Sequence, residues 1–225
     1  MERKKEFVRN EELMFARIKK ILGKDFIGPD ELKKIRRVFH AGLPDKPTPK
    51  LPWTEARLKK MRGAYVLILG TPTDDKGRKL TLVRMRSIFG WDLKKSEPCF
   101  YNQDWYMKEA FAAGKTLGYK WYLIGKNILS KTRGKSPNAI SMSLKKDETF
   151  PSAILTAYTF FAYYFLNKKS RLWKHDFIWG SDRDRNKDAV YTGRYADPDK
   201  INKNGFNIHR YLSIGPRYGF VSQIL

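Results

Sequence analysis

One long apolar run, PSAILTAYTFFAYYFLN at residues 151–167, constrains the fold more than any other feature of this sequence. Such a run is buried either in a protein core or in a bilayer. A membrane span needs about 20 predominantly apolar residues. This run has 17 residues, and hydroxyl groups interrupt it, among them those of Thr156 and Thr159. Its length and polarity therefore favour a buried amphipathic helix over a membrane span.

The chain is strongly basic, with a formal net charge of +23 over 225 residues. A field of that sign attracts nucleic acid, anionic lipid headgroups or acidic proteins. The charge is spread as +8 over residues 1–60, +5 over 61–125, +8 over 126–175 and +2 over 176–225. General basicity for solubility is the alternative explanation. Hydrophobic residues make up 41% of the chain, which is enough for a sizeable core.

The single cysteine, Cys99, cannot form an intramolecular disulfide. The first residues, MERKKEFVRNEELMF, contain no apolar segment typical of a signal peptide. Both observations predict a cytoplasmic protein. His40, His175 and His209 share no metal-ligand spacing, and no phosphate-loop motif is complete, so we expect neither a metal nor a cofactor.

The N-terminal part predicts a helical unit at residues 1–43, with helices over 10–22 and from Pro29 to Gly42. Four prolines make residues 44–53 an extended linker. Thr54 can cap a further helix that ends near Met61. The remainder, 54–225, predicts one α+β domain. Its expected strands are 64–70, 80–89 and 119–125, its expected helices are 104–117 and 151–167, and several short strands follow.

Two polar segments resemble ligand-binding loops. Residues Asp182–Asp188 place an oxygen ligand at every second position, as calcium loops do, but Lys187 and Gly193 stand where an EF-hand has glycine and glutamate. We expect a solvated loop whose charges pair locally. Residues 130–136 end in Gly-Lys-Ser, yet Leu129 and Pro137 break the phosphate-loop pattern.

That second segment remains a cationic loop. Its basic side chains are Lys126, Lys131, Arg133 and Lys135. Trp121 and Tyr122 precede it, and basic side chains beside stacking aromatics suit single-stranded nucleic acid. An ordinary solvated loop is the alternative. The loop therefore supports a second functional hypothesis, a basic nucleic-acid-binding protein, with nucleases included in that class.

The C-terminal half carries short motifs of a known family. GYKWYL at 118–123 precedes the apolar helix, and IWGS at 178–181, VYTGR at 190–194 and NGFNIHR at 204–210 follow it. This layout resembles that of bacterial C-type-lectin-like proteins, which include fibrobacter-type paralogous domains and variable proteins diversified by retroelements. The resemblance covers residues 63–225. It implies a C-type-lectin-like α+β domain that binds a protein or other macromolecular ligand and is not an enzyme.

The resemblance also implies a ligand face on the last strands and loops. We expect that face to comprise Trp179, Asp182, Asp184, Asn186, Tyr191, Arg194, Tyr195, Asn207, His209 and Tyr211. Trp179 is equally well explained as a core residue. Strand alternation places six residues on or near the packed side: Ile178, Val190, Phe206, Ile208, Leu212 and Ile214. It leaves Asp184, Asn186, Tyr191, Arg194, Asn207 and His209 wholly or partly accessible.

Overall fold

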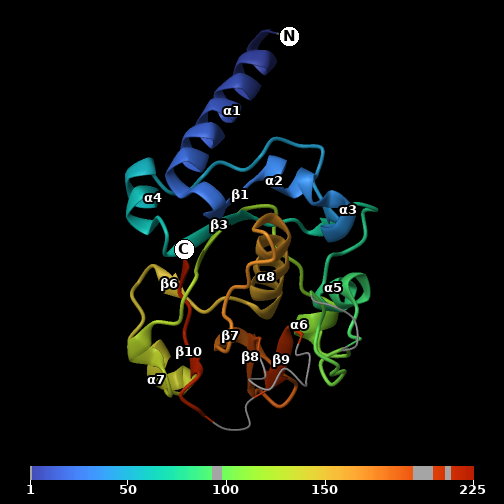
Figure 1. Ribbon diagram of the computed structural model, residues 1–225, viewed down its shortest axis with the longest axis vertical. Helices are drawn as coiled ribbons and strands as arrows, with labels where there is room; N and C mark the ends of the chain where they lie inside the picture. Colours follow the sequence, from blue (N-terminus) through green and yellow to red (C-terminus); the bar gives the residue numbers. More distant parts are fainter. Residues whose placement is uncertain (1, 93–97, 195–204, 211–213) are drawn as a thin grey trace.

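A five-stranded sheet lies at the centre of the fold in the computed structural model, which describes residues 2–92, 98–194, 205–210 and 214–225 (Figure 1). The strand order is β1 (Phe26–Ile27), β3 (Tyr65–Leu69), β5 (Trp121–Gly125), β11 (Gln223–Ile224) and β6 (Glu148–Thr149). β1 runs parallel to β3, and the other neighbours pair antiparallel. The apolar runs near 64–70 and 119–125 are strands, as predicted, because the core buries them.

The short C-terminal strands form a second sheet. Its order is β10 (Tyr218–Gly219), β7 (Phe177–Arg183), β8 (Ala189–Gly193) and β9 (Asn207–Arg210). β10 is parallel to β7, and β7, β8 and β9 are antiparallel neighbours. A third, two-stranded sheet joins β2 (Ala41–Gly42) to β4 (Thr73–Asp74). The molecule is therefore a mixed α+β protein, as the sequence predicts.

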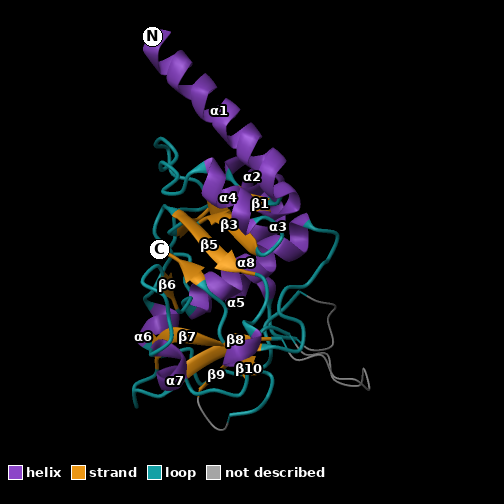
Figure 2. Ribbon diagram, turned by 90° about the vertical axis from the view of Figure 1, so that its left-hand side faces the viewer, coloured by secondary structure: helices purple, strands orange, loops and turns teal. Residues whose placement is uncertain are grey.

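Helix α8 (Ala153–Leu166) is the predicted apolar helix, and it lies between the two larger sheets (Figure 2). The Ser152 hydroxyl caps its first turn by accepting from the Leu155 N–H at 3.4 Å. The Tyr158 hydroxyl donates to the Leu69 carbonyl of β3 at 3.2 Å. On the opposite side, the hydroxyls of Thr156 and Thr192 are 2.8 Å apart. In the described ranges, no helix has both the length and the apolar character that crossing a membrane requires.

The N-terminal helices pack against one end of the central sheet. They are α1 (Glu2–Leu22), α2 (Pro29–Lys34), α3 (Arg36–Phe39) and α4 (Glu55–Met61), with a 3-10 turn at Gly23–Asp25. α1 is longer than predicted and projects away from the body (Figure 1). The helix predicted from Pro29 breaks at Ile35. Thr54 caps α4 as predicted, accepting from the Arg57 N–H at 3.3 Å.

The proline-rich stretch 44–53 contains no helix or strand and packs on the body. The indole Nε1–H of Trp121 donates to the Pro49 carbonyl at 2.8 Å. Trp53 is buried and donates to the Leu225 carbonyl at 3.3 Å. These two bonds hold the stretch against the central sheet.

Residues 80–89 were predicted to be a strand, and that prediction is wrong. Residues 82–89 form helix α5 (Leu82–Phe89), which begins where the Thr81 hydroxyl accepts from the Arg84 N–H at 3.1 Å. Leu82 and Met85 are buried, and Phe89 stacks on Phe161 of α8 at 4.0 Å between ring centroids. The sequence alternates at period two, but its apolar residues also recur at helical spacing, and packing against α8 selects the helix.

Two other segments also differ from their predictions. Within 104–117, only Ala110–Ala113 is helical, as α6, because turns held by Asp104 and Tyr106 carbonyls precede it. The basic loop contains a 3-10 turn at Ser130–Thr132 and is followed at once by helix α7 (Pro137–Ser141).

Candidate functional site

Two of the aromatic residues predicted at the recognition face, Trp179 and Tyr191, belong to a second core cluster. Trp179 is 0% exposed, and its indole N–H donates to the Lys135 carbonyl at 3.0 Å. Tyr191 packs edge-on against Trp179, with ring centroids 5.3 Å apart. The Tyr218 hydroxyl donates to that of Tyr191 at 3.3 Å. Burial, reinforced by Tyr218, raises the pKa of Tyr191. Both rings therefore act as packing groups.

The two aspartates predicted there are buried; both oxygens of Asp182 accept internal hydrogen bonds, whereas Asp184 accepts them at Oδ1 and its Oδ2 has no hydrogen-bond partner among the described residues. Asp182 accepts from the Lys115 ammonium and from the Ala153 N–H at the start of α8, both at 2.6 Å. Asp184 accepts from two backbone N–H groups of its own turn, at 2.9 and 2.8 Å, and Arg210 lies 3.7 Å away. The expectation of a solvated Asp182–Asp188 loop is wrong for these two side chains. They hold the β7–β8 turn and the start of α8 in place.

Three further predicted residues lie in or beside the same sheet. Arg194 and Asn207 are buried, and the Asn207 amide donates to the Gly205 carbonyl at 3.1 Å. His209 is half-buried, stacks on Tyr191 and lies 2.7 Å from the amide nitrogen of Gln103. Burial lowers the pKa of His209.

The remaining predicted positions divide three ways. Asn186 is exposed at the β7–β8 turn, as predicted. Tyr195, Tyr211 and Leu212 lie outside the described residues. Ile214 is 37% exposed, so its expected place on the packed side is wrong.

The predicted accessibility of Asp184, Tyr191, Arg194 and Asn207 is also wrong. Period-two alternation leaves one face to solvent only when nothing covers that face. α8 and the main core cover the face that carries Ile178, Val190 and Ile208. The opposite face packs in the second cluster, which contains Ile140, Trp179, Tyr191 and Phe220.

A cavity on another part of the molecule gathers basic side chains. It has a volume of about 350 Å³ and lies where the 3-10 turn after α1, the end of β5 and the segment after α8 meet. Its lining residues, here called the basic pocket, are Lys24, Lys126, Asn127, Tyr163, Ser170, Arg171, Leu172, Trp173, Lys174 and Asp176. Four of the ten are cations, and they come from three segments far apart in the sequence.

A buried acid orients one of these cations. Asp25, 4% exposed, accepts from the Lys126 ammonium at 2.9 Å and from the Tyr163 hydroxyl at 3.1 Å. Burial, together with the neighbouring Asp25 charge, raises the pKa of Tyr163. Because Lys126 is held at its ammonium end and is only 17% exposed, its charge has a fixed position at the cavity wall.

The segment after α8 is held in an unusual backbone conformation. Lys168, Lys169, Trp173 and His175 all have positive φ angles, from 50° to 67°. Such angles are uncommon for residues other than glycine, and they concentrate at functional sites when the surrounding structure enforces them. The buried Trp173 side chain anchors this segment, since its indole N–H donates to the Gly125 carbonyl of β5 at 3.2 Å.

The predicted cationic loop reaches the same site. Lys126 lines the basic pocket, and Arg133 donates to both carboxylate oxygens of Asp176 at 2.7 and 3.2 Å. Lys131 and Lys135 are exposed along the loop. Of the four predicted basic residues, Lys126 therefore lines the pocket and Arg133 contacts it through Asp176.

The sequence also predicted stacking aromatic side chains beside the cationic loop, and that prediction is wrong. Trp121 and Tyr122 are buried, and Trp121 stacks on Phe26 with centroids 5.6 Å apart. Neither ring is available to stack on a base. Sequence reasoning also missed Lys24, Arg171 and Lys174. The signal was the charge of the 126–175 segment, since KKSRLWK at 168–174 places four cations around one tryptophan.

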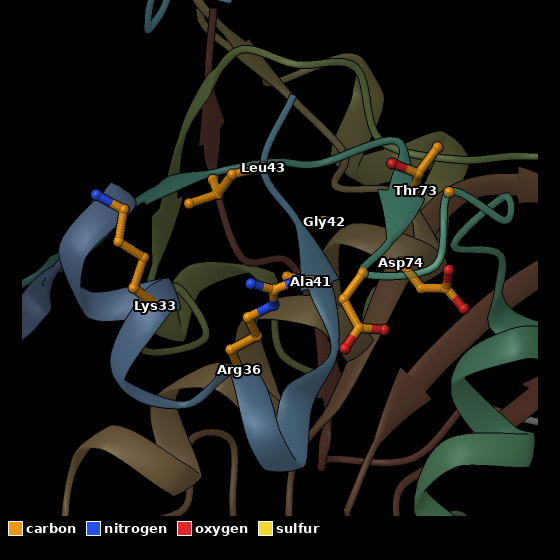
Figure 3. Close-up of a pocket in the computed structure, with 9 residues that line it drawn as sticks. Lys33, Arg36, Ala41, Gly42, Leu43, Thr73 and Asp74 are labelled. Atoms are coloured by element: carbon orange, nitrogen blue, oxygen red, sulfur yellow. The ribbon is translucent and has the colours of Figure 1, made fainter. Parts of the chain in front are cut away.

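A second cavity, of about 390 Å³, lies between the α2–α3 helices and the β2–β4 sheet (Figure 3). Lys33 and Arg36 line one side, and Asp74 and Asp75 line it from β4 and its turn. Burial would raise the pKa of Asp74, but backbone N–H groups and two arginines donate to the carboxylate and hold its pKa below the usual range. His40 lies 3.1 Å from Asp75. The mixed charges distinguish this cavity from the basic pocket.

In the parts of the chain that the structure describes, no group of three histidine, cysteine or acidic residues is placed to hold a metal ion. Comparisons with protein-family models, curated proteins and solved structures find no match to this chain.

Proposed function

We propose that the protein binds nucleic acid through phosphate groups at the basic pocket. The observation that carries this proposal is the convergence of Lys24, Lys126, Arg171 and Lys174 on one cavity. Folding such charges together costs free energy by mutual repulsion, and an anion in the cavity offsets that cost. Among the described residues, Asp176 is the one acid that lines the cavity, and Arg133 engages it, while Asp25 pairs with Lys126.

The chemistry of the lining favours phosphate contacts over base recognition. The aromatic rings at the cavity, those of Tyr163 and Trp173, are buried and bonded within the protein. Cations, the Asn127 amide and the Ser170 hydroxyl remain as contact groups. Contacts of this kind position a nucleic acid without reading its sequence. We therefore expect binding that depends weakly on sequence and strongly on salt.

A nucleic acid fits this surface better than a membrane does. Proteins that bind at a membrane interface usually insert exposed apolar side chains beside their basic residues. The exposed large apolar side chains of the described regions are Leu13, Val38, Trp91, Met142, Ile214 and Leu225. None of them lines the basic pocket.

The recognition face on the last strands, with its C-type-lectin-like fold, is the weaker proposal. Trp179, Tyr191, Asp182 and Asp184 are buried, and each of them makes at least one hydrogen bond within the protein. A ligand would have to displace those internal bonds.

The test is a titration of labelled random oligonucleotides, single-stranded and duplex, at 50 and 200 mM salt. The test variant is Lys24→Ala/Arg171→Ala/Lys174→Ala. A matched control, Lys76→Ala/Lys79→Ala/Lys108→Ala, removes the same charge from exposed positions outside the basic pocket. Affinity for duplex DNA should fall with salt by about 0.9 log units per log unit of salt for each phosphate contacted. In the test variant, both the affinity and its dependence on salt concentration should decrease, whereas the control variant should retain most of both.

Equal losses in the two triple variants would show that general basicity, not the basic pocket, attracts the oligonucleotide. Absence of binding at 50 mM salt would refute the proposed function. A parallel titration with vesicles containing anionic lipid adds a further outcome. If vesicles bind through the pocket residues and oligonucleotides do not, the partner is a membrane surface and the proposal is wrong.

A further inference from the structure

We infer that the basic pocket selects the terminal phosphomonoester of a nucleic-acid strand over the phosphodiesters inside the strand. This inference rests on the proposed function and specifies its ligand. It follows from the shape of the site, from its surplus of positive charge and from the way its side chains are held.

The first argument is shape. Surfaces that track a nucleic-acid backbone spread their basic residues along a groove and stack bases on aromatic rings. Here the cations converge on a cavity of about 350 Å³, and the nearby rings of Tyr163 and Trp173 are buried. A compact group of cations around one cavity suits a single phosphate group better than a run of phosphates. A strand end presents such a group, whereas an internal phosphodiester is flanked by sugars on both sides.

The second argument is charge. Asp25 balances Lys126, and Arg133 balances Asp176. Lys24 and Lys174 form no ion pair with a carboxylate among the described residues, and Arg171 stacks over the Tyr164 ring at 5.6 Å. The pocket therefore has a surplus of positive charge. A phosphomonoester carries about −1.5 to −2 charges near pH 7 and three acceptor oxygens, whereas a phosphodiester carries a single negative charge.

The third argument is preorganisation. Asp25 fixes the Lys126 ammonium, and the Trp173 anchor fixes the backbone that carries Ser170, Arg171 and Lys174. Fixed donors lose little conformational freedom when an anion binds. The positive φ angles of Trp173 and His175 show that the surrounding structure maintains this arrangement against local backbone preference.

The experiment is a competition assay with the full chain. A labelled random oligonucleotide is displaced by unlabelled strands of one sequence that carry a 5′-phosphate, a 3′-phosphate or no terminal phosphate. A fourth competitor, one nucleotide longer and without a terminal phosphate, controls for an added charge. We expect a phosphorylated end to compete at least about tenfold better than either unphosphorylated strand. The 5′ and 3′ arms identify which end is selected.

Two further measurements separate the pocket from general charge. Arg171→Ala/Lys174→Ala should remove most of the preference for a phosphorylated end, whereas Lys76→Ala/Lys79→Ala should keep it. The preference should also shrink between pH 7 and pH 5, because the second ionisation of the phosphomonoester is near pH 6. Competition by the unphosphorylated strand, measured at each pH, corrects for changes in the protein's own charge.

Equal competition by all four strands would overturn this inference and leave the proposed function standing. A preference that survives Arg171→Ala/Lys174→Ala would also overturn it, because the selecting site would lie elsewhere. If no strand binds at all, the proposed function fails together with the inference.

Discussion

The β7–β9 strands and the basic pocket are both rich in charged and aromatic side chains, yet the structure uses them in opposite ways. In the strands, Asp182 and Asp184 are buried, and backbone or lysine donors bind both oxygens of Asp182 and one oxygen of Asp184. In the pocket, Lys24 and Lys174 are exposed at a cavity where the described lining contains one acid, Asp176.

From this contrast we expect ligand contacts at exposed charged side chains without internal partners rather than at every polar side chain. A buried carboxylate with several donors stabilises the native state and is costly to disturb. Exposed like charges contribute little to stability and remain available to a ligand. The predictions below test this contrast by stability and affinity, beginning with the largest expected effect.

The largest effect is expected at Trp179 of β7, which is 0% exposed. Trp179→Ala removes a large buried ring and the bond to the Lys135 carbonyl, so unfolding free energy should fall by about 3–5 kcal/mol. Urea denaturation followed by circular dichroism measures it. A loss below about 1 kcal/mol would indicate that Trp179 does not belong to the core.

The next effect is expected at Asp182. Asp182→Ala leaves the Ala153 N–H at the start of α8 without its acceptor, and stability should fall by about 1–3 kcal/mol. Asp188→Ala is the matched control, because it removes a carboxylate of the same turn that is only half-buried. If both variants unfold at the same urea concentration, the buried Asp182 carboxylate contributes no more to stability than the half-buried Asp188 carboxylate, and this prediction is wrong.

A smaller effect, dependent on pH, is expected at His209. Burial lowers its pKa in the folded state, so below about pH 6.5 the unfolded chain binds the additional proton. Stability should therefore decrease as the pH falls from about 6.5 through the folded pKa and should be unaffected by this group above that range. His209→Gln should flatten that part of the profile in thermal melts. An unchanged profile would show that other groups cause it.

The smallest effect on stability is expected at the basic pocket. Lys24→Ala and Lys174→Ala should each change unfolding free energy by less than about 0.5 kcal/mol, as should Asn186→Ala at the exposed β7–β8 turn. The pocket variants should nevertheless weaken oligonucleotide binding, whereas Asn186→Ala should not. A large loss of stability at Lys24 or Lys174 would assign them a structural role.

Much of the fold could be predicted from the sequence wherever one signal was strong. The apolar run 151–167 had to be buried. Thr54 directly precedes a segment of helical apolar spacing, which is the position of an N-cap residue. The segment 80–89 was ambiguous, because its apolar spacing fits a strand and a helix alike. The stacking of Phe89 on Phe161 decides between them, and this contact spans more than seventy residues of sequence.

The candidate site could be predicted only in part, for a related reason. Lys126 and Arg133 were found because they cluster within one loop. Lys24 was missed because it reaches the site through the fold, and its only local signal was one lysine near the end of a helix. The strand residues were misassigned because alternation cannot show that both faces of a sheet will be covered.

The position of β11 affects how this protein can be made in the cell. Residues 223–224 lie between β5 and β6, so the last of this sheet's five strands in sequence order is an interior strand. Its partner β5 is separated from it by about a hundred residues, and closing so long a loop slows folding. Until residue 224 leaves the ribosome, the edges of β5 and β6 lack their shared neighbour. From the synthesis of β5 and β6 until that point, the nascent chain has unpaired strand edges, and such edges are sites where chaperones act and aggregation begins.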